Sequence, residues 1–469
     1  MAQAANISKW EDMIFDNEAC TRCGDCFHFC PELQLPRELA IREIKSLRTG
    51  FDGKYVLQYC LTCFTCNTIC KNNAEPYQLI LKNWNRKYRD RGAPPIYRFI
   101  CPTMENSIFQ MLEPLMTQQE RDLTNRWMNQ EPGETVLLIG NYTHLFPLIL
   151  GESRLLDHFT PIDLLDHWEA GATLYQGGYL DVVRQIGWKC RGEFDRWQVK
   201  TVVPLLDAVE HMLSKALPKE MGIKFRQNIV NFNDWLLQRL EDNTISLKHP
   251  LKMKVTLHDN CFAKAGGNRY FDNARKIVSA TGCEIREMQH TRSDSLCCGF
   301  GAGASWERNI HIPFDILASG KKKIAEAEST GAEALVTYCG GCLYLLWAAK
   351  ELFRSKLKVY HHVELVRMAM GETIEQEQEG HIRRAWDVIA IITYHLLTGI
   401  SKRPFWIEEL SLKEDKWEYK KYPLFRILRR FLDTRIGRCM YRRGFLLLLP
   451  LLKRNHPVFP VKPQQSTSN

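Results

Sequence analysis

Two runs of four cysteines near the start of the chain are the residues best suited to chemistry. In each run two residues separate the first three cysteines, and three separate the third from the fourth. The runs are Cys20, Cys23, Cys26 and Cys30, and Cys60, Cys63, Cys66 and Cys70. Thiolates at this spacing can reach several iron corners of one cubane from a single tight loop, whereas zinc sites favour two separated pairs. The runs therefore predict iron–sulfur clusters and electron transfer, with zinc as the alternative.

The spacing is typical of bacterial ferredoxins, in which the fourth cysteine of each run ligates the other cluster. On that pattern Cys20, Cys23, Cys26 and Cys70 hold one 4Fe-4S cluster, and Cys60, Cys63, Cys66 and Cys30 hold the second. Pro31 follows the first run as the pattern requires, but Lys71 replaces the proline after the second. We expect residues 1–100 to form an α-helical dicluster ferredoxin-like domain.

Five more cysteines lie beyond the middle of the chain, next to glycines and close to the ends of predicted strands. They are Cys261, Cys297, Cys298, Cys339 and Cys342, with Gly299 after the adjacent pair and Gly340 and Gly341 between the last two. Adjacent thiolates cannot easily bind one face of a regular cubane, but they can hold different irons of an opened cluster. The pattern predicts a noncubane-type cluster, and the alternative is a set of buried structural thiols.

Other residues near these cysteines have two interpretations each. His258 and Asp259 could supply a proton to a departing thiolate, or they could simply hydrogen-bond a loop. Gly299, Gly301 and Gly303 could let a substrate approach the backbone, or they could form a plain turn. Four remaining cysteines, Cys101, Cys190, Cys283 and Cys439, are expected to be inert.

The elements that must position these residues alternate between strand and helix. Strand-like runs occur at 135–139, 199–203, 253–258 and 334–338, and helical stretches at 269–280 and 343–353. Such alternation predicts parallel sheets whose ligand sites lie at the carboxyl ends of the strands. The length of 469 residues suits roughly three domains, and 45% hydrophobic with 25% charged residues is ordinary for a globular chain.

The motifs also carry a family resemblance. Residues 255–342 contain His-Asp-Asn-Cys at 258–261, Cys-Cys-Gly at 297–299 and Cys-Gly-Gly-Cys at 339–342. This stretch resembles the cysteine-rich CCG domain of heterodisulfide reductases. With the two runs ahead of it, the part of the chain from 15 to 370 resembles the D subunit of heterodisulfide reductase. It also resembles the C subunit of anaerobic glycerol-3-phosphate dehydrogenase and the K subunit of sulfite-reductase-associated membrane complexes.

The resemblance implies two Rossmann-like CCG half-domains, the first of them degenerate. Gly140 and Asn141 follow the strand at 135–139 where a cysteine would be expected. Glu169, Ala170 and Gly171 stand in place of Cys-Cys-Gly, and Pro204, Leu205 and Leu206 end the strand at 199–203 without a thiol. We expect a degenerate domain at 101–248, a CCG domain at 249–372, and a C-terminal extension at 373–469.

By resemblance, the chain is an iron–sulfur oxidoreductase subunit. Two cubanes would carry electrons to the five-cysteine cluster, which would act on a disulfide or persulfide substrate. The alternative is a noncatalytic electron-transfer subunit that links a dehydrogenase to a membrane quinone or cytochrome b partner. Expected partners are other subunits of a redox complex, either an integral-membrane cytochrome b-like subunit or a flavoprotein.

The positive charge of the chain is concentrated at its C-terminus. From Lys421 onward there are eleven basic residues and one acid, a net charge of +10, against +9 for the whole chain. Arginines alternate with apolar residues there, so we expect a basic amphipathic segment for membrane or partner docking, with a helix packed on its own protein as the alternative. Nucleic acid is not an expected partner.

The expected location follows from targeting and membrane signals. The first ten residues lack the pattern of a secretory signal, and no apolar run reaches the length of about 20 residues that a spanning helix requires. The longest runs, at 388–400 and 445–452, are both interrupted. With its 17 cysteines the chain is expected in a reducing compartment, peripheral on the cytoplasmic face of a membrane. We find no haem, flavin or nicotinamide motif.

Overall fold

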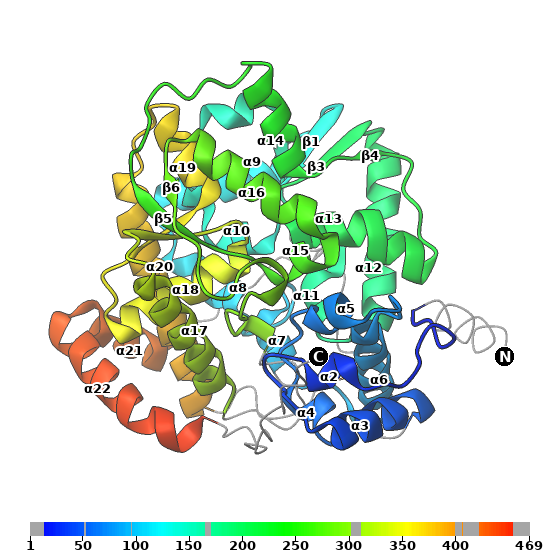
Figure 1. Cartoon of the computed structure of the whole chain (residues 1–469). Coiled ribbons are helices and arrows are strands. Elements are labelled where there is room, and N and C mark those ends of the chain that lie inside the picture. Colours follow the sequence, from blue (N-terminus) through cyan, green and yellow to red (C-terminus); the bar gives the residue numbers. More distant parts are fainter. Residues whose placement is uncertain are drawn as a thin grey trace, which may run out of the picture.

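The computed structural model describes residues 14–50, 53–94, 96–164, 170–301, 311–398, 406 and 422–453. Its N-terminal part is helical and lies at the lower right of Figure 1. Short helices adjoin the cysteine runs, and two longer ones, α3 and α6, support them. The helices are α2 Asp25–His28, α3 Arg37–Thr49, α4 Val56–Tyr59, α5 Thr65–Ile69 and α6 Pro76–Arg91.

A buried carboxylate holds the second cysteine run against the first part of this helical unit. Glu43 on α3 is 5% exposed, and its oxygens accept hydrogen bonds from the backbone N–H groups of Lys54, Tyr55 and Val56 at 2.8–3.0 Å. These are free N–H groups at the start of α4, which a carboxylate satisfies well. The loop that carries Cys60 is thereby fixed on α3.

Three helices connect this unit to the first sheet: α7 Ile96–Ile100, α8 Ile108–Leu112 and α9 Gln118–Asn129. The first sheet is parallel with the strand order β2-β1-β3-β4. Its strands are β1 Thr135–Leu138, β2 Thr160–Ile162, β3 Thr201–Pro204 and β4 Asn228–Ile229. The helices around it are α10 Asn141–Leu145, α11 Ala172–Gln176, α12 Leu180–Trp197, α13 Asp207–His211 and α14 Phe232–Glu241, with π-helical turns at Met212–Glu220.

The second sheet is also parallel, and its order β6-β5-β7-β8 repeats that of the first. Its strands are β5 Lys254–His258, β6 Glu284–Ile285, β7 Ala334–Thr337 and β8 Lys358–His361. All of β7, and β5 after its first residue, is buried, as expected for a parallel sheet covered on both faces. The helices are α15 Cys261–Gly266, α16 Asn268–Ala280, α17 Ile312–Ser329, α18 Gly340–Phe353 and α19 His362–Ala369.

The predicted strands at 135–139, 199–203, 253–258 and 334–338 are confirmed within a few residues, as is the helix at 269–280. That helix ends where Gly282 adopts a φ of +84°, the left-handed conformation that favours glycine after a helix. The helix predicted at 343–353 begins earlier, at Gly340. The mixed α/β class with parallel sheets is therefore confirmed.

Three helices follow the second sheet: α20 Glu375–Thr398, α21 Pro423–Asp433 and α22 Arg435–Leu452. Helix α20 packs on α18, α21 packs on α20, and α22 contacts α17 and α21. In Figure 1 the last two lie at the lower left, away from the N-terminal helices. None of the described helices combines the length and apolar character needed to cross a membrane. The two interrupted apolar runs of the sequence fall in α20, as far as residue 398, and in α22.

Candidate functional site

The two cysteine runs lie side by side, with Cys26 on α2 and Cys66 on α5. Burial raises the pKa of the Cys26 thiol, and the nearby Cys70, Cys20 and Cys23 raise it further. The structure thus brings Cys70, the fourth cysteine of the second run, beside the first three of the first run.

Cys30, the fourth cysteine of the first run, lies close to a thiol of the second run. Burial raises the pKa of Cys30 to about 12, with a further contribution from Cys63. Burial also raises the pKa of Cys66, followed by contributions from Cys60, Cys26, Cys63 and Cys30. Cys30 therefore lies close to thiols of the second run, and Cys66 lies close to Cys26 of the first run as well.

Exposure differs between the two groups of thiols. Cys23 is exposed and Cys20 and Cys70 are half-buried, whereas Cys30, Cys60, Cys63 and Cys66 are all buried. The group that contains Cys23 thus faces solvent, and the group that contains Cys63 lies toward the interior. Lys71, which replaces the usual proline, is exposed directly after Cys70.

All five cysteines of the later set line one cavity at the carboxyl ends of β5 and β7. The cavity contains about 600 Å³ of space between atoms, counting any part continuous with solvent. The cysteines in its wall are Cys261, Cys297, Cys298, Cys339 and Cys342, together with Cys63 of the second run. The convergence expected from strand positions is present, and no sequence motif indicated that Cys63 would join it.

Cys298 is the centre of this thiol group. Hydrogen bonds with Cys297 and Cys342, and then with His258, lower the pKa of the Cys298 thiol. The Cys298 contact raises the pKa of both Cys297 and Cys342. The ligand atoms of His258, Cys298 and Cys342 lie within 4.8 Å of one another, so these three can bind a common metal centre.

The glycines beside the cysteines allow close packing of backbone. Gly299 has a φ of +102°, and a Cβ there would lie 2.3 Å from the carbonyl oxygen of Ile316 on α17. A Cβ on Gly340 would lie 2.9 Å from the Cβ of Tyr142. Cys339 precedes α18 directly, so the free N–H groups of its first turn lie beside the thiols and favour negative charge there. Gly303 lies outside the described residues.

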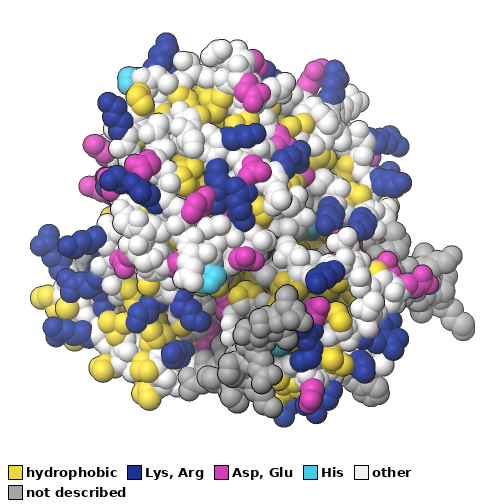
Figure 2. All heavy atoms as spheres, in the orientation of Figure 1, with side chains coloured by type: hydrophobic (Ala, Val, Ile, Leu, Met, Phe, Trp, Pro, Cys, Tyr) yellow, Lys and Arg dark blue, Asp and Glu magenta, His cyan; other side chains and the backbone are white. Residues whose placement is uncertain are grey.

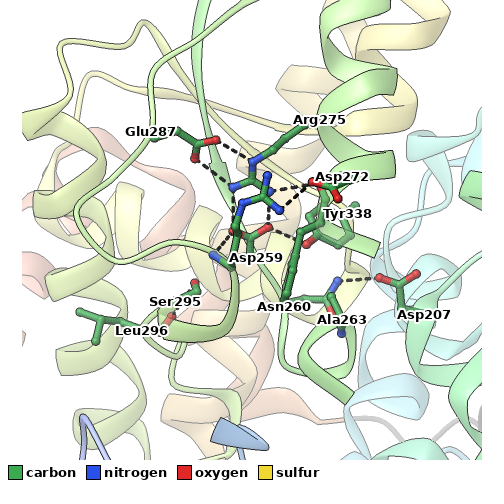
Figure 3. Close-up of polar contacts among 12 residues, drawn as sticks. Asp207, Asp259, Asn260, Ala263, Asp272, Arg275, Glu287, Ser295, Leu296 and Tyr338 are labelled. Carbon is green, nitrogen blue, oxygen red and sulfur yellow. Dashed lines mark hydrogen bonds and ion pairs between the residues drawn. The ribbon is translucent and has the colours of Figure 1, made fainter. Parts of the chain in front are cut away.

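Asp259 anchors the loops that carry the cysteines (Figure 3). Its carboxylate accepts two hydrogen bonds from Arg275 at 2.9 Å, one from the backbone N–H of Arg292 at 2.6 Å and one from the Tyr338 hydroxyl at 2.8 Å. Although burial opposes them, these contacts hold the pKa of Asp259 below its ordinary value. Asp259 is thus a loop-binding residue, which was the second of its two interpretations.

Two polar side chains join the N-terminal helical unit to the five-cysteine cavity. The ammonium of Lys264 donates to the Thr65 hydroxyl at 2.8 Å and to the carbonyl oxygen of Ser295 at 2.6 Å. The Gln176 amide donates to the carbonyl oxygen of Thr62 at 2.9 Å and to the Cys261 sulfur at 3.3 Å. A buried cation and an amide thus lie between the two sets of thiols.

The first sheet's half of the chain supplies the opposite wall of the cavity. Tyr142, Ala172, Thr173, Leu206 and Ala208 line it, and each lies at or just after one of the positions where the sequence lacks an expected cysteine. The sequence identified those positions as empty of thiols but did not mark wall residues there. Glu169, which stands at one of them, lies outside the described residues; Ala170 and Gly171 precede α11.

Comparison with known families agrees with both cysteine sets. The 4Fe-4S dicluster domain matches residues 12–71, and the cysteine-rich domain named CCG matches residues 255–346. The chain therefore contains both domains. The first match covers the two runs of four cysteines, and the second covers all five cysteines of the cavity.

Several known proteins are similar over most of the chain. The D subunit of dihydromethanophenazine:CoB–CoM heterodisulfide reductase from Methanosarcina barkeri is 22% identical over 76% of this chain and 95% of its own length. The B subunit of fumarate reductase (CoM/CoB) from Methanothermobacter marburgensis is 25% identical over 75% of this chain and 72% of its own. The probable iron-sulfur-binding oxidoreductase FadF of Bacillus subtilis is 23% identical over 78% of this chain and 48% of its own.

Proposed function

We propose that this chain, an iron–sulfur electron-transfer protein related to subunits of heterodisulfide and fumarate reductases, passes electrons between a dicluster domain and a third cluster that acts on a sulfur substrate. The substrate is a disulfide or persulfide. The observation that carries the proposal is the single cavity in which five cysteines meet Cys63 of the dicluster domain.

The thiols available fit three clusters. By the crossed ferredoxin pattern, Cys20, Cys23, Cys26 and Cys70 would hold one cubane, and Cys60, Cys63, Cys66 and Cys30 the second. The proximity of Cys26 to Cys70 and of Cys30 to Cys63 supports this division. Cys261, Cys297, Cys298, Cys339 and Cys342 would hold the third, a noncubane-type cluster. When bound, the third cluster supplies single electrons and a Lewis-acidic iron at the cavity.

The protein groups around the thiols would stabilise the charge of the bound clusters. Lys264 places a buried ammonium between the Thr65 and Ser295 loops, and the first turn of α18 directs its free N–H groups to the same region. Gln176 donates a hydrogen bond to Cys261, and hydrogen bonds to ligating sulfurs raise the reduction potential of a cluster. These contacts favour electron flow from the N-terminal unit into the cavity.

The order of exposure supports an entry point at the first thiol group. Cys23 is exposed, while Cys63 is buried and lines the five-cysteine cavity. A redox partner that binds near Cys23 would therefore exchange electrons with the group nearest the surface. Disulfide reduction consumes two electrons and two protons and yields two thiols, and the reverse reaction is equally compatible with these residues.

We also propose that the first sheet is a CCG half that has lost its cluster. Both sheets have the same strand order, and Gly171 and Gly299 have φ values of +83° and +102° at corresponding positions after the second strands. Residues 101–248 would then be scaffold and cavity wall, 249–372 the cluster-binding half, and 373–469 a docking extension.

The test is iron and acid-labile sulfide analysis with electron paramagnetic resonance on anaerobically prepared protein. The Cys297→Ser variant should lose the iron of the third cluster and keep that of the dicluster domain. Exposed Cys439 provides the control, since Cys439→Ser should lose none. A paramagnetic signal that changes on adding a disulfide, and does so only with Cys297 intact, would support chemistry at sulfur. A preparation that contains only zinc would refute the proposal.

A second candidate is a noncatalytic electron-transfer subunit docked on a membrane partner, such as a cytochrome b-like subunit or a flavoprotein. The observation that favours it is the outer face of α21 and α22. Figure 2 shows basic and apolar side chains mixed over the place of these helices. Five apolar side chains on this face are each more than 60% exposed, namely Leu424, Ile427, Ile436, Leu447 and Leu451. A paramagnetic signal that stays unchanged with every disulfide tested would favour this candidate. With a membrane partner, the chain would lie on the cytoplasmic face of the membrane.

A further inference from the structure

A second cavity adjoins the five-cysteine cavity and has no role in the proposed function. It contains about 1130 Å³ of space between atoms, counting the part continuous with solvent. Tyr142, Thr173, Gln176 and Phe300 line both cavities. The two cavities are therefore adjacent. We call it the apolar chamber.

The walls of the chamber are almost entirely hydrocarbon and aromatic. Most of the wall residues come from α7, α17, α18, α20 and α22, which supply Phe99, Phe314, Leu345, Ile389, Leu396 and Phe445. Ligand cavities are typically apolar with a few polar groups that fix orientation. A hydrocarbon chain can bury its whole surface against such walls, whereas a charged or sugar-like molecule would lose its hydration without replacement hydrogen bonds.

One end of the chamber carries a polar group without a partner. Thr62, between Cys60 and Cys63, lines the chamber and is 0% exposed. Its hydroxyl has no hydrogen-bond partner among the described residues, although buried polar groups normally have one. An oxygen of a bound molecule at this end would satisfy the hydroxyl.

The other end of the chamber lies under the C-terminal helix. Tyr441 and Phe445 of α22 line it, while Met440, Leu447 and Leu451 of the same helix are 58%, 73% and 76% exposed. One helix thus separates the chamber from an outer face that mixes apolar and basic side chains. Such a face suits the surface of an anionic membrane, which is the source of hydrocarbon-tailed molecules.

We propose that the apolar chamber binds a lipid-soluble molecule with a hydrocarbon tail and a small head that accepts hydrogen bonds. The tail packs against α18 and α20, and the head accepts a hydrogen bond from Thr62 beside the cysteine cavity. An isoprenoid-type quinone and a fatty acyl lipid share this chemistry. The proposal goes beyond the sulfur chemistry and does not depend on which clusters are bound.

The test is direct binding to the full chain, measured by equilibrium dialysis. The probes are a decyl-substituted benzoquinone, dodecanoic acid, and a benzoquinone without a tail. Leu396→Trp fills the chamber from α20 and should raise the Kd of the tailed probe about tenfold or more. Leu397→Trp is the matched control, because Leu397 is 75% exposed on the same helix and is not a lining residue. Iron per chain, measured on the same samples, reports separately on the proposed function.

Tail-dependent binding that is weakened by Leu396→Trp but not by Leu397→Trp supports the proposal, and the tighter of the two tailed probes identifies the source. Thr62→Val should lower the affinity for that probe by about threefold to tenfold, whereas Thr62→Ser, which keeps the hydroxyl, should bind it about as well as the wild type. The proposal is overturned if wild-type protein binds neither tailed probe, or binds the tailless quinone equally well. Those two measurements are decisive even if Leu396→Trp does not fold.

Discussion

Replacing Asp259 by Asn should destabilise the cysteine loops far more than removing the other carboxylate that contacts the same arginine. Asp259 and Glu287 both accept hydrogen bonds from Arg275 (Figure 3). The Asp259 side chain is 0% exposed, whereas that of Glu287 is 43% exposed. Asp259→Asn and Glu287→Gln are therefore matched changes that differ in burial.

The expected magnitudes follow from that difference. Breaking a buried ion pair by removing one charge costs about 3–5 kcal/mol when the remaining charge is left unpaired. Because Arg275 would keep its ion pair with Glu287, Asp259→Asn should cost about 3 kcal/mol, the lower end of this range. The amide in Asp259→Asn would retain one acceptor oxygen for the donors that Asp259 now satisfies, which come from Arg275, Arg292 and Tyr338. An exposed ion pair contributes about 0–1 kcal/mol, so Glu287→Gln should cost no more than about 1 kcal/mol.

The assay combines chemical denaturation with iron analysis under anaerobic conditions. Asp259 lies just before Cys261, and Arg292 precedes Cys297 in the neighbouring loop, so separating these two loops should release the proposed third cluster. We expect iron to fall from about twelve to about eight atoms per chain in Asp259→Asn, with an earlier unfolding midpoint. Glu287→Gln should keep its full iron content. Equal losses in the two variants, or a stable Asp259→Asn protein with full iron, would refute the reasoning.

Three other perturbations test separate parts of the structure. A Cβ on Gly301 would lie 1.9 Å from the carbonyl oxygen of Leu61 in the dicluster loop, so Gly301→Ala should lower both the iron content and the stability of the protein. A Cβ on Gly192 would have nothing within 4 Å. In thermal unfolding, Gly192→Ala should therefore be neutral or stabilising by up to about 1 kcal/mol. Burial lowers the pKa of His211 from 6.5 to about 3, so the folded protein holds this side chain in its neutral form. The free energy of unfolding should therefore fall as the pH is lowered from 6.5 toward 3, by about 1.4 kcal/mol per pH unit. Denaturation of His211→Phe over the same pH series should show a shallower fall. Arg430 is exposed, whereas Arg429 is bound to Asp387 and Asp433. In a sedimentation assay, Arg430→Gln should lower the affinity for anionic vesicles about fivefold. Arg429→Gln should mainly reduce the stability of the protein.

The C-terminal arginines show how much of this region could be predicted from sequence. The alternation of basic and apolar residues predicted an amphipathic segment, which forms the helices α21 and α22 in the structure. It could not divide the arginines into two classes. Arg429 pairs with Asp387, and Arg442 pairs with Glu351 and lies over the Trp386 ring, whereas Arg430 is exposed. Acids and an aromatic ring from other helices decided that division.

The cavity walls could not be predicted from the sequence. Tyr142 and Thr173 lie in the first sheet's half of the chain, far before Cys261, and no motif marks them. They became wall residues because the two sheets direct the carboxyl ends of their strands toward a shared space. A pattern search finds thiols by their spacing, but residues such as Gln176 and Lys264 are ordinary in type and acquire their roles from what they contact.

The sequence by itself determined the thiol inventory, the alternation that produces two parallel sheets, and the basic character of the C-terminus, because spacing and periodicity are properties of neighbouring residues. Only the tertiary structure decided that Cys63 shares a cavity with Cys297, that Lys264 lies between the two thiol sets, and that an apolar chamber adjoins them. Those contacts join segments that are far apart in the chain. They depend on how side chains pack across domains, and this packing cannot be predicted from a local sequence pattern.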